Sequence, residues 1–432
     1  MSNFKRYDKY KDSGIEWIGE IPEEWKVEPL KRIVKLIQTG RTPTTKNEDY
    51  FNGEIQWFTP GDFLEDKVLS ESKRKISSIA IIDNEARLFP KKTIIVVGIG
   101  ATVGKVAILG IDGSFNQQIT GIIADEQKVN SDYLYYWLHA NQEVIKNISN
   151  YTTLPIINNE SLKNFECLLM PLSEQREIIN FLDQKTAEID DLIADKEKLI
   201  ELLQEKRQAV ITEAVTKGLN PNVKMKDSGI EWIGDIPEGW EITKLKYICS
   251  ITMGQSPKSE EYSREEGGLP FLQGNAEFTE LYPHPKIYCD TANKRSKVND
   301  ILLSVRAPVG KMNISNRVYG IGRGLCAITA QKVHLKYLWY SMNVSLEELS
   351  INSQGSTFEA VTVADVDNLS AIVPPADEQI SIANFLDQKT AEIDSLVSEI
   401  QEQIQKLREY RQSLIFEAVT GKIDVRDYAA VS

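Results

Sequence analysis

A few stretches of the sequence carry residue types at spacings that suggest phosphate or metal chemistry, and each fails a specific requirement. The stretch GIGATVGK at 98–105 approaches the phosphate-binding pattern G-x-x-x-x-G-K-[ST], but Ile99 replaces the first glycine and Val106 replaces the hydroxyl that binds Mg²⁺. A glycine-supported turn between two strands is the better interpretation. The three histidines and four cysteines are scattered without a C-x-x-C pair, which argues against both a zinc site and a disulfide framework.

Two further catalytic patterns are incomplete. PEEWK at 22–26 has the acidic-x-Lys end of a metal-dependent nuclease site, but a second copy of this stretch reads PEGWE, with Gly239 and Glu241 in place of Glu24 and Lys26. The sequence also lacks the [Asn or Asp]-Pro-Pro-aromatic loop that an amino-methyltransferase needs to hold a flipped base. We therefore expect no catalytic residue, no metal and no cofactor in this chain, and a function in binding.

Basic side chains concentrate in two regions that are neutral overall. The net charge is −13, but residues 26–170 hold 17 basic and 17 acidic residues, and residues 241–374 hold 14 of each. Both regions can therefore present local basic faces to nucleic acid. The candidate DNA-binding residues are Lys73, Arg74, Lys75, Lys91, Lys92 and Lys105 in the first region, and Lys294, Arg295, Lys297, Arg306, Lys311, Arg317 and Arg323 in the second. For any single one of them, a solvated charged face is the alternative.

The elements that must position these residues are duplicated. KDSGIEWIGEIPEEW at 11–25 returns as KDSGIEWIGDIPEGW at 226–240, with 13 of 15 positions identical, and FLDQKTAEID at 181–190 returns unchanged at 385–394. The two intervening regions are related but diverged, since IIVVGIGATVGKVAI aligns with ILLSVRAPVGKMNI. The contrast indicates a frame that does one thing twice around two inserts that do different things.

Each FLDQKTAEID stretch opens a long predicted helix. Ser173 and Asp377 are suitable N-cap residues, Gly218 and Gly421 are suitable stops, and no proline or glycine interrupts the chain between them. A seven-residue spacing of apolar residues predicts a coiled-coil seam with one polar break at Lys196. The seam residues are Leu182, Ile189, Leu203, Val210, Leu386, Ile393, Ile400, Leu407 and Leu414. We expect the two helices to pair antiparallel about a pseudo-twofold axis, against the alternative that each packs separately on its own domain.

Each insert is predicted to be a separate α/β or mostly β domain, because short apolar runs such as KTIIVVGIG, KVAIL and DILLSV are bounded by turn residues. YLYYWLHANQEVIKNI and YLWYSMNVSLEELS each predict one amphipathic helix. The chain is thus predicted to be α+β, with these divisions: N-terminal segment 1–25, first domain 26–172, central helix 173–218, repeated segment 219–240, second domain 241–376, C-terminal helix 377–421 and tail 422–432.

The whole pattern resembles the specificity subunit of type I restriction-modification systems. The resemblance rests on SGIEWIGEIPEEW and SGIEWIGDIPEGW, on MPLSEQREIINFLDQKTAEID and VPPADEQISIANFLDQKTAEID, and on GATVGKVAI with FNQQITGI. It implies two target-recognition domains, each of which reads one half of a bipartite site in double-stranded DNA, and a coiled coil that sets the spacing. The second domain departs from the family pattern, because RGLCAI stands where the first has Asn116 and Gln117.

The resemblance also implies the partners. These are two methyltransferase subunits that bring S-adenosylmethionine and restriction subunits that use ATP and Mg²⁺, while this chain itself is non-catalytic. With neither a signal peptide nor a membrane span in the sequence, we expect a cytoplasmic protein. The main alternative is a coiled-coil scaffold whose two domains bind proteins or glycans. An enzyme is a more distant alternative.

Overall fold

The computed structural model describes residues 4–63, 67–147, 150–151, 155–231, 233–265, 267–351, 361–426 and 428. It divides into two compact units, of which unit 1 comprises residues 1–196 and 402–432 and unit 2 comprises residues 197–401. Each unit therefore contains one insert, one copy of the repeated segment and a part of each long helix. Among the described residues, no helix has the length and apolar character required to cross a membrane.

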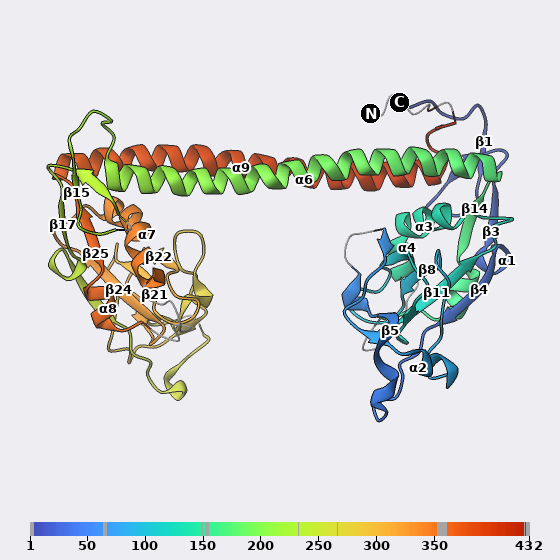
Figure 1. Cartoon of the computed structure of the whole chain (residues 1–432), viewed down its shortest axis with the longest axis horizontal. Helices are drawn as coiled ribbons and strands as arrows, with labels where there is room; N and C mark the ends of the chain where they lie inside the picture. Colours follow the sequence, from blue (N-terminus) through green and yellow to red (C-terminus); the bar gives the residue numbers. More distant parts are fainter. Residues whose placement is uncertain are drawn as a thin grey trace. The chain divides into compact units, whose positions relative to one another are not determined.

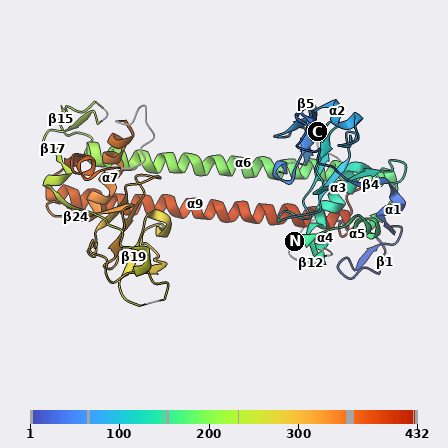
Figure 2. The same ribbon diagram turned by 90° about the horizontal axis from the view of Figure 1, so that it is seen from below.

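The two long helices are α6 (Leu172–Lys217) and α9 (Ala376–Val419), and within each unit they lie side by side and antiparallel (Figures 1 and 2). In unit 1, Arg411 binds the Asp190 carboxylate with its Nε 2.9 Å from Oδ1, and Lys196 Nζ donates to Gln403 Oε1 at 2.6 Å. In unit 2, Arg207 Nε lies 2.9 Å from the equivalent carboxylate, Asp394 Oδ1. The polar break at Lys196 thus has a polar partner on the other helix.

Along the seam, every predicted residue is at least half-buried. Leu182, Ile189, Leu386, Ile393, Ile400 and Leu414 are buried, and Leu203, Val210 and Leu407 are half-buried. The seam is completed by a second set of residues, each four positions after a residue of the first set. The seven-residue spacing did not identify this second set. It includes Ile193, Ile200 and Ile404, and it also carries the two arginines that pair across the helices.

Both helices begin one residue earlier than predicted, so Ser173 and Asp377 lie in the first turn and are not N-caps. Their backbone N–H groups are among those that a helix start leaves without an intrahelical acceptor. At the other end, Gly218 and Gly421 have φ of +76° and +70°, as expected of helix-terminating glycines.

The inserts share one sheet plan. The main sheet of unit 1 has the order β4-β11-β8-β9-β6, and that of unit 2 has the order β18-β24-β21-β22. The strands are β4 (Val34–Thr39), β11 (Ile119–Ala124), β8 (Ile94–Val97), β9 (Val106–Leu109) and β6 (Val68–Leu69), and then β18 (Cys249–Met253), β24 (Leu325–Ala330), β21 (Ile301–Ser304) and β22 (Met312–Ile314). The GIGATVGK stretch is the turn between β8 and β9, as predicted.

Smaller sheets accompany the main one in both units. A second sheet is ordered β10-β5-β7 in unit 1 and β20-β19-β23 in unit 2, and two strands from the insert ends pair as β3-β14 and β17-β25. Their bounds are β10 (Ser114–Phe115), β5 (Phe51–Phe58), β7 (Lys75–Ile76), β20 (Ile287–Tyr288), β19 (Pro270–Leu272), β23 (Gly320–Ile321), β3 (Lys26–Pro29), β14 (Glu166–Leu169), β17 (Glu241–Lys244) and β25 (Ser370–Val373). The repeated segments form the hairpins β1 (Tyr10–Asp12) with β2 (Glu20–Pro22) and β15 (Met225–Asp227) with β16 (Asp235–Pro237).

Helices cover the sheets and join them to the coiled coil. In unit 1 the predicted single helix is two, α3 (Ser131–Ala140) and α4 (Gln142–Asn147), because Asn141 ends the first and folds its side chain back onto the Trp137 carbonyl. In unit 2 the counterpart is the continuous α7 (Leu335–Ile351). Short helices complete the set: α1 (Leu30–Ile33), α2 (Ser78–Ile82), α5 (Asn159–Asn164) and α8 (Val363–Asp367).

A buried tyrosine ties each insert to both long helices. Tyr133 on α3 donates to the carbonyls of Leu168, 3.1 Å away, and Val419, 3.3 Å away. Tyr337 on α7 makes the equivalent bonds, at 3.0 Å to the Ile372 carbonyl and at 3.3 Å to that of Val215. Burial raises the pKa of both hydroxyls well above the usual value, so both remain donors. Each hydroxyl therefore satisfies a carbonyl of an insert strand and one at the end of the helix that arrives from the other unit.

We expect Tyr133→Phe and Tyr337→Phe each to destabilise the chain by about 1–2 kcal/mol, because two buried carbonyls lose their donor. In a domain of this size that change lowers the melting temperature by about 2–8 °C. Tyr247, which is 60% exposed, provides the matched control Tyr247→Phe. Thermal unfolding curves in which either buried variant melts with the control would contradict this role.

Candidate nucleic-acid interface

The two inserts present different side chains from the same structural position. In each, a short parallel strand pair ends beside a turn that leads into the second strand of the main sheet, β11 in unit 1 and β24 in unit 2. The registers Phe58↔Phe115 in unit 1 and Leu272↔Ile321 in unit 2 match, and this places Gln117 and Arg323 at equivalent points. Both side chains are exposed.

A glycine on the neighbouring loop fixes this turn in both units. Gly40 N donates to the Ile119 carbonyl at 3.0 Å, and Gly254 N donates to the Leu325 carbonyl at 2.9 Å. A Cβ on either glycine would lie 2.1 Å from a backbone oxygen of the turn, so no other residue fits. The departure from the family pattern at RGLCAI therefore leaves the strand pairing unchanged and alters only the side chains that it presents.

In unit 2 the turn borders a cavity of about 610 Å³. Arg306 enters from the turn after β21, and Arg323 enters from the turn before β24. Other lining residues include Tyr262, Gln273, Asn275 and Glu277. Guanidinium groups and amides are the side chains that most often bind phosphates and the edges of guanine and adenine, and an aromatic ring adds an apolar contact surface.

Glu277 is the one carboxylate among these lining residues. Its Oε2 is buried and has no hydrogen-bond partner among the described residues. Burial is the main cause that raises the pKa of this carboxyl, and it outweighs the opposing effect of Lys286. The Glu277 carboxyl is therefore part of the wall of the cavity that Arg306 and Arg323 border, with one oxygen shielded from solvent.

The equivalent loops of unit 1 are more internally bonded. Thr42 Oγ1 donates to Gln117 Oε1, and Asn116 Nδ2 donates to Gln118 Oε1 at 2.9 Å. Arg41, which directly follows Gly40, is exposed, and its guanidinium donates to the Asn84 carbonyl. Unit 1 thus offers amide and hydroxyl groups and the Arg41 guanidinium, whereas unit 2 offers two guanidinium groups around one cavity.

Among the candidate cations, Arg306 and Arg323 lie around one cavity. Lys105 and Lys311 occupy equivalent positions before β9 and β22, but Lys105 is half-buried and its Nζ donates to the Phe63 carbonyl at 3.2 Å, whereas Lys311 is exposed. Lys105 therefore supports the backbone of unit 1, and Lys311 remains accessible at the same end of the sheet as the two arginines.

The remaining candidates lie elsewhere on the inserts. Lys91, Lys92 and Lys297 precede β8 or β21, at the opposite end of the main sheet from the cavity turns, and Lys92 pairs with Asp132 of α3 at 3.7 Å. Arg295 binds the carbonyls of Ala292 and Asp290 within its own loop. Lys73, Arg74, Lys75, Lys294 and Arg317 are exposed, and Arg317 lies over the Tyr319 ring at 5.5 Å. DNA contact by any of these residues stays a prediction.

The sequence prediction was based on runs of basic residues and did not include the polar residues of the turns. Arg41 follows β4 in unit 1 and Gln255 follows β18 in unit 2, and the pairing of these strands with β11 and β24 brings each residue to the turn of its own unit. The available signal was the repeat itself, since both inserts place a glycine before a polar loop in TGRTP and MGQSP.

The inserts have clear relatives. A family model described as "Type I restriction modification DNA specificity domain" matches residues 22–202 and again residues 237–406. A protein of Methanocaldococcus jannaschii named "Putative type I restriction enzyme MjaX specificity subunit" is 32% identical over 430 residues, which cover 95% of this chain and 96% of that protein. The "Type I restriction enzyme MjaIX specificity subunit" of the same organism is 26% identical and covers 99% of both chains.

Solved structures share the fold. A chain from work described as "Structural basis underlying complex assembly and conformational transition of the type I R-M system" superposes with a TM-score of 0.73 at 24% identity, covering 92% of this chain and 98% of that one. The "HsdS subunit from Thermoanaerobacter tengcongensis" gives a TM-score of 0.53 at 23% identity, covering 93% of this chain and 98% of that one. The predicted arrangement of two domains and two long helices is thereby confirmed.

The buried carboxyl of Glu277 predicts a pH-dependent stability difference. A carboxyl whose pKa is raised on folding favours the folded state at low pH, and this contribution is lost as the pH rises through the raised pKa. Glu277→Gln removes the cost of the buried charge, so the variant should melt at a higher temperature than the parent at pH 7. The difference should vanish near pH 4, where the parent carboxyl is protonated. Glu280→Gln, at an exposed site, is the control. A gain of equal size at both pH values would contradict this assignment.

Proposed function

The chain belongs to the family of type I restriction-modification DNA specificity domains, and from this membership we propose that it is the non-catalytic subunit that reads a bipartite DNA site. Each insert would read one half of the site. The observation that carries the proposal is the shared scaffold with exchanged side chains, in which Gln117 of unit 1 and Arg323 of unit 2 stand at one structural position. The two inserts have the same strand pairing but different side chains at the turn, as expected if they recognise two different half-sites.

The cavity of unit 2 supports a role in base recognition. Arginine binds the O6 and N7 acceptors of guanine with two hydrogen bonds, and Arg306 and Arg323 border the same space. The amides at the equivalent turn of unit 1 suit adenine, which offers one donor and one acceptor in the major groove. Exposed cations elsewhere on the inserts would contact phosphates and hold the register.

The duplicated helix surfaces support two identical partners. Near the start of α6, Gln184 and Lys185 both bind Glu188, at 2.8 and 2.6 Å. The same network recurs on α9, where Gln388 and Lys389 bind Glu392. Two methyltransferase subunits that bring S-adenosylmethionine would dock on these equivalent surfaces, and restriction subunits with ATP and Mg²⁺ would join the complex. The long helices would set the spacing between the half-sites, and the complex would act in the cytoplasm.

Single-molecule mapping of N6-methyladenine in cells with and without the gene tests this function. The expected result is one bipartite methylated motif that is present with the gene and lost without it. If the methylation pattern is unchanged, the chain does not specify methylation. The scaffold alternative, in which the domains bind proteins or glycans, gains no support from the relatives found.

We expect the double variant Arg306→Ala/Arg323→Ala, in the complex with its methyltransferase subunits, to bind its DNA site at least ~10-fold more weakly. If an arginine contacts a phosphate, its removal should also reduce the slope of the logarithm of the binding constant against the logarithm of the salt concentration, by up to about one unit per arginine. The matched control removes the same charge from the same insert through Lys246→Ala/Lys332→Ala. Lys332 N donates to the Ile248 carbonyl and Lys246 Nζ donates to Asn368 Oδ1, and neither residue lines the cavity. Equal weakening in both double variants, measured by titration at several salt concentrations, would show that only net charge matters.

A further inference from the structure

In unit 1, aromatic residues from the two ends of the chain cover the start of α6. The rings of Phe4 and Tyr428 pack edge-on against Phe181, with centroids 5.3 and 4.8 Å away, and Phe181 is only 1% exposed. Next to them, the Tyr7 hydroxyl donates to Glu174 Oε1 at 2.8 Å, and the Trp25 indole donates to the same oxygen at 3.1 Å. The covering segment is thus held by two aromatic anchors three residues apart, Phe4 and Tyr7.

Unit 2 has the receiving surface without these anchors. The hairpin registers Tyr10↔Pro22 and Met225↔Pro237 align the two repeated segments, and the same sequence offset sets Leu219 and Asn222 against Phe4 and Tyr7. Leu219 is 43% exposed, and Asn222 is exposed as well. Phe385, the counterpart of the buried Phe181, is only half-buried, and among the described residues no aromatic ring packs against it.

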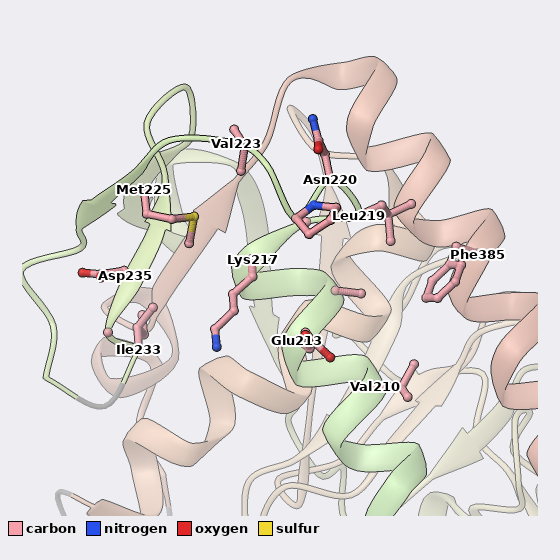
Figure 3. Close-up of a pocket in the computed structure, with 14 residues that line it drawn as sticks. Val210, Glu213, Lys217, Leu219, Asn220, Val223, Met225, Ile233, Asp235 and Phe385 are labelled. Carbon is pink, nitrogen blue, oxygen red and sulfur yellow. The ribbon is translucent and has the colours of Figure 1, made fainter.

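Two cavities are lined by the counterparts of Phe181 and Glu174, which are the residues that the two anchors contact in unit 1. One, of about 800 Å³, is lined by Phe385 of α9, Val210 of α6, and Leu219, Met225 and Ile233 of the repeated segment (Figure 3). The second, of about 300 Å³, is lined by Glu378, which is the counterpart of Glu174 and accepts the Trp240 indole at 3.0 Å. In unit 1 the carboxylate at this position accepts a tyrosine hydroxyl in addition to the indole.

We propose that these two cavities of unit 2 form one docking site for an extended segment of a partner protein that carries two aromatic side chains three residues apart. A tyrosine hydroxyl of that segment donates to Glu378, and the second ring packs edge-on against Phe385. The geometry is the one that Phe4 and Tyr7 adopt in unit 1.

Charge specifies the segment further. The lining residues include the acidic Glu213, Asp235 and Glu378 and one lysine, Lys217, so the site favours a basic segment. The segment 4–10 of unit 1 also combines aromatic rings with cations. The guanidinium of Arg426 lies 4.6 Å from the Tyr7 ring centroid, and that of Arg6 lies 5.1 Å from the Tyr10 ring centroid. Cations over the outer faces of the rings stabilise such an arrangement further.

The occupant is assigned to a partner and not to a second copy of this chain. Within the described residues, the segment that has this chemistry is 4–10, and it is already bound in unit 1, where Tyr7 is 8% exposed. A second copy would have to withdraw this segment from its own unit. The site itself does not depend on the proposed DNA function.

A labelled peptide of residues 4–12, FKRYDKYKD, tests the site on the full-length chain by fluorescence anisotropy. We expect saturable 1:1 binding with a dissociation constant below about 1 mM, weakened at least ~10-fold by Phe385→Ala in the protein and by Tyr7→Ala in the peptide. Leu396→Ala, at an exposed position of α9 outside the lining residues, is the control and should bind like the parent. Absence of saturable binding, or equal binding by Phe385→Ala, would overturn the proposal.

A filled variant guards against loss of folding as the explanation. Leu219 lines both cavities, so Leu219→Phe places a ring between them and should raise the melting temperature and reduce peptide binding at least ~10-fold. Undiminished peptide binding by this folded variant would overturn the proposal. Sedimentation of the chain without peptide tests the alternative occupant. If the parent chain forms dimers and the filled variant does not, the site binds a second copy of the chain, and the proposal of a partner protein is wrong.

Discussion

Antiparallel pairing of α6 with α9 is the interaction on which both units depend. Unit 1 combines residues 1–196 with residues 402–432, and unit 2 is the continuous stretch 197–401, so each unit contains the end of one long helix and the start of the other. Each insert therefore completes its core with the end of a helix that begins in the other unit. The hydroxyls of Tyr133 and Tyr337 are central to this arrangement, because each bonds one carbonyl of the insert and one at the end of the arriving helix.

Duplication separates the parts of the structure that are constrained from those that are free to change. The buried polar contacts recur almost atom for atom: Gln175 and Gln379 each donate to the carbonyl of the fifth residue before them, and the indoles of Trp25 and Trp240 each bind a glutamate near the start of a long helix. Buried groups of this kind are costly to leave unpaired. The exposed turns carry no such cost, so the two inserts diverge there without a change of strand pairing.

The sequence was sufficient to predict the frame. The long helices, their antiparallel pairing and the glycine stops follow from repeats and from a period of seven, which are local signals. The helix starts were displaced by one residue, and α3 and α4 were predicted as one helix, since the bond from Asn141 back to the Trp137 carbonyl is not visible in a hydrophobic pattern. Strand existence was predictable, but sheet order was not.

The candidate interface was less accessible to sequence reasoning. Arg306 and Arg323 are 17 residues apart in sequence and meet at one cavity only because β21 and β24 pair with a specific register. Lys105 shows the converse case, in which a cation from a basic cluster is used to hold a backbone carbonyl. Whether a charge is free for a ligand depends on contacts that no local pattern encodes.

The central claim is that each insert reads one half of a bipartite DNA site while the frame keeps the halves in register. The most direct test replaces residues 241–374 with the corresponding insert of a relative and maps adenine methylation in cells that carry the chimaera. The account predicts that one half of the methylated motif changes and that the other half and the spacer stay as they were. A motif that changes in both halves, or in neither, would contradict it.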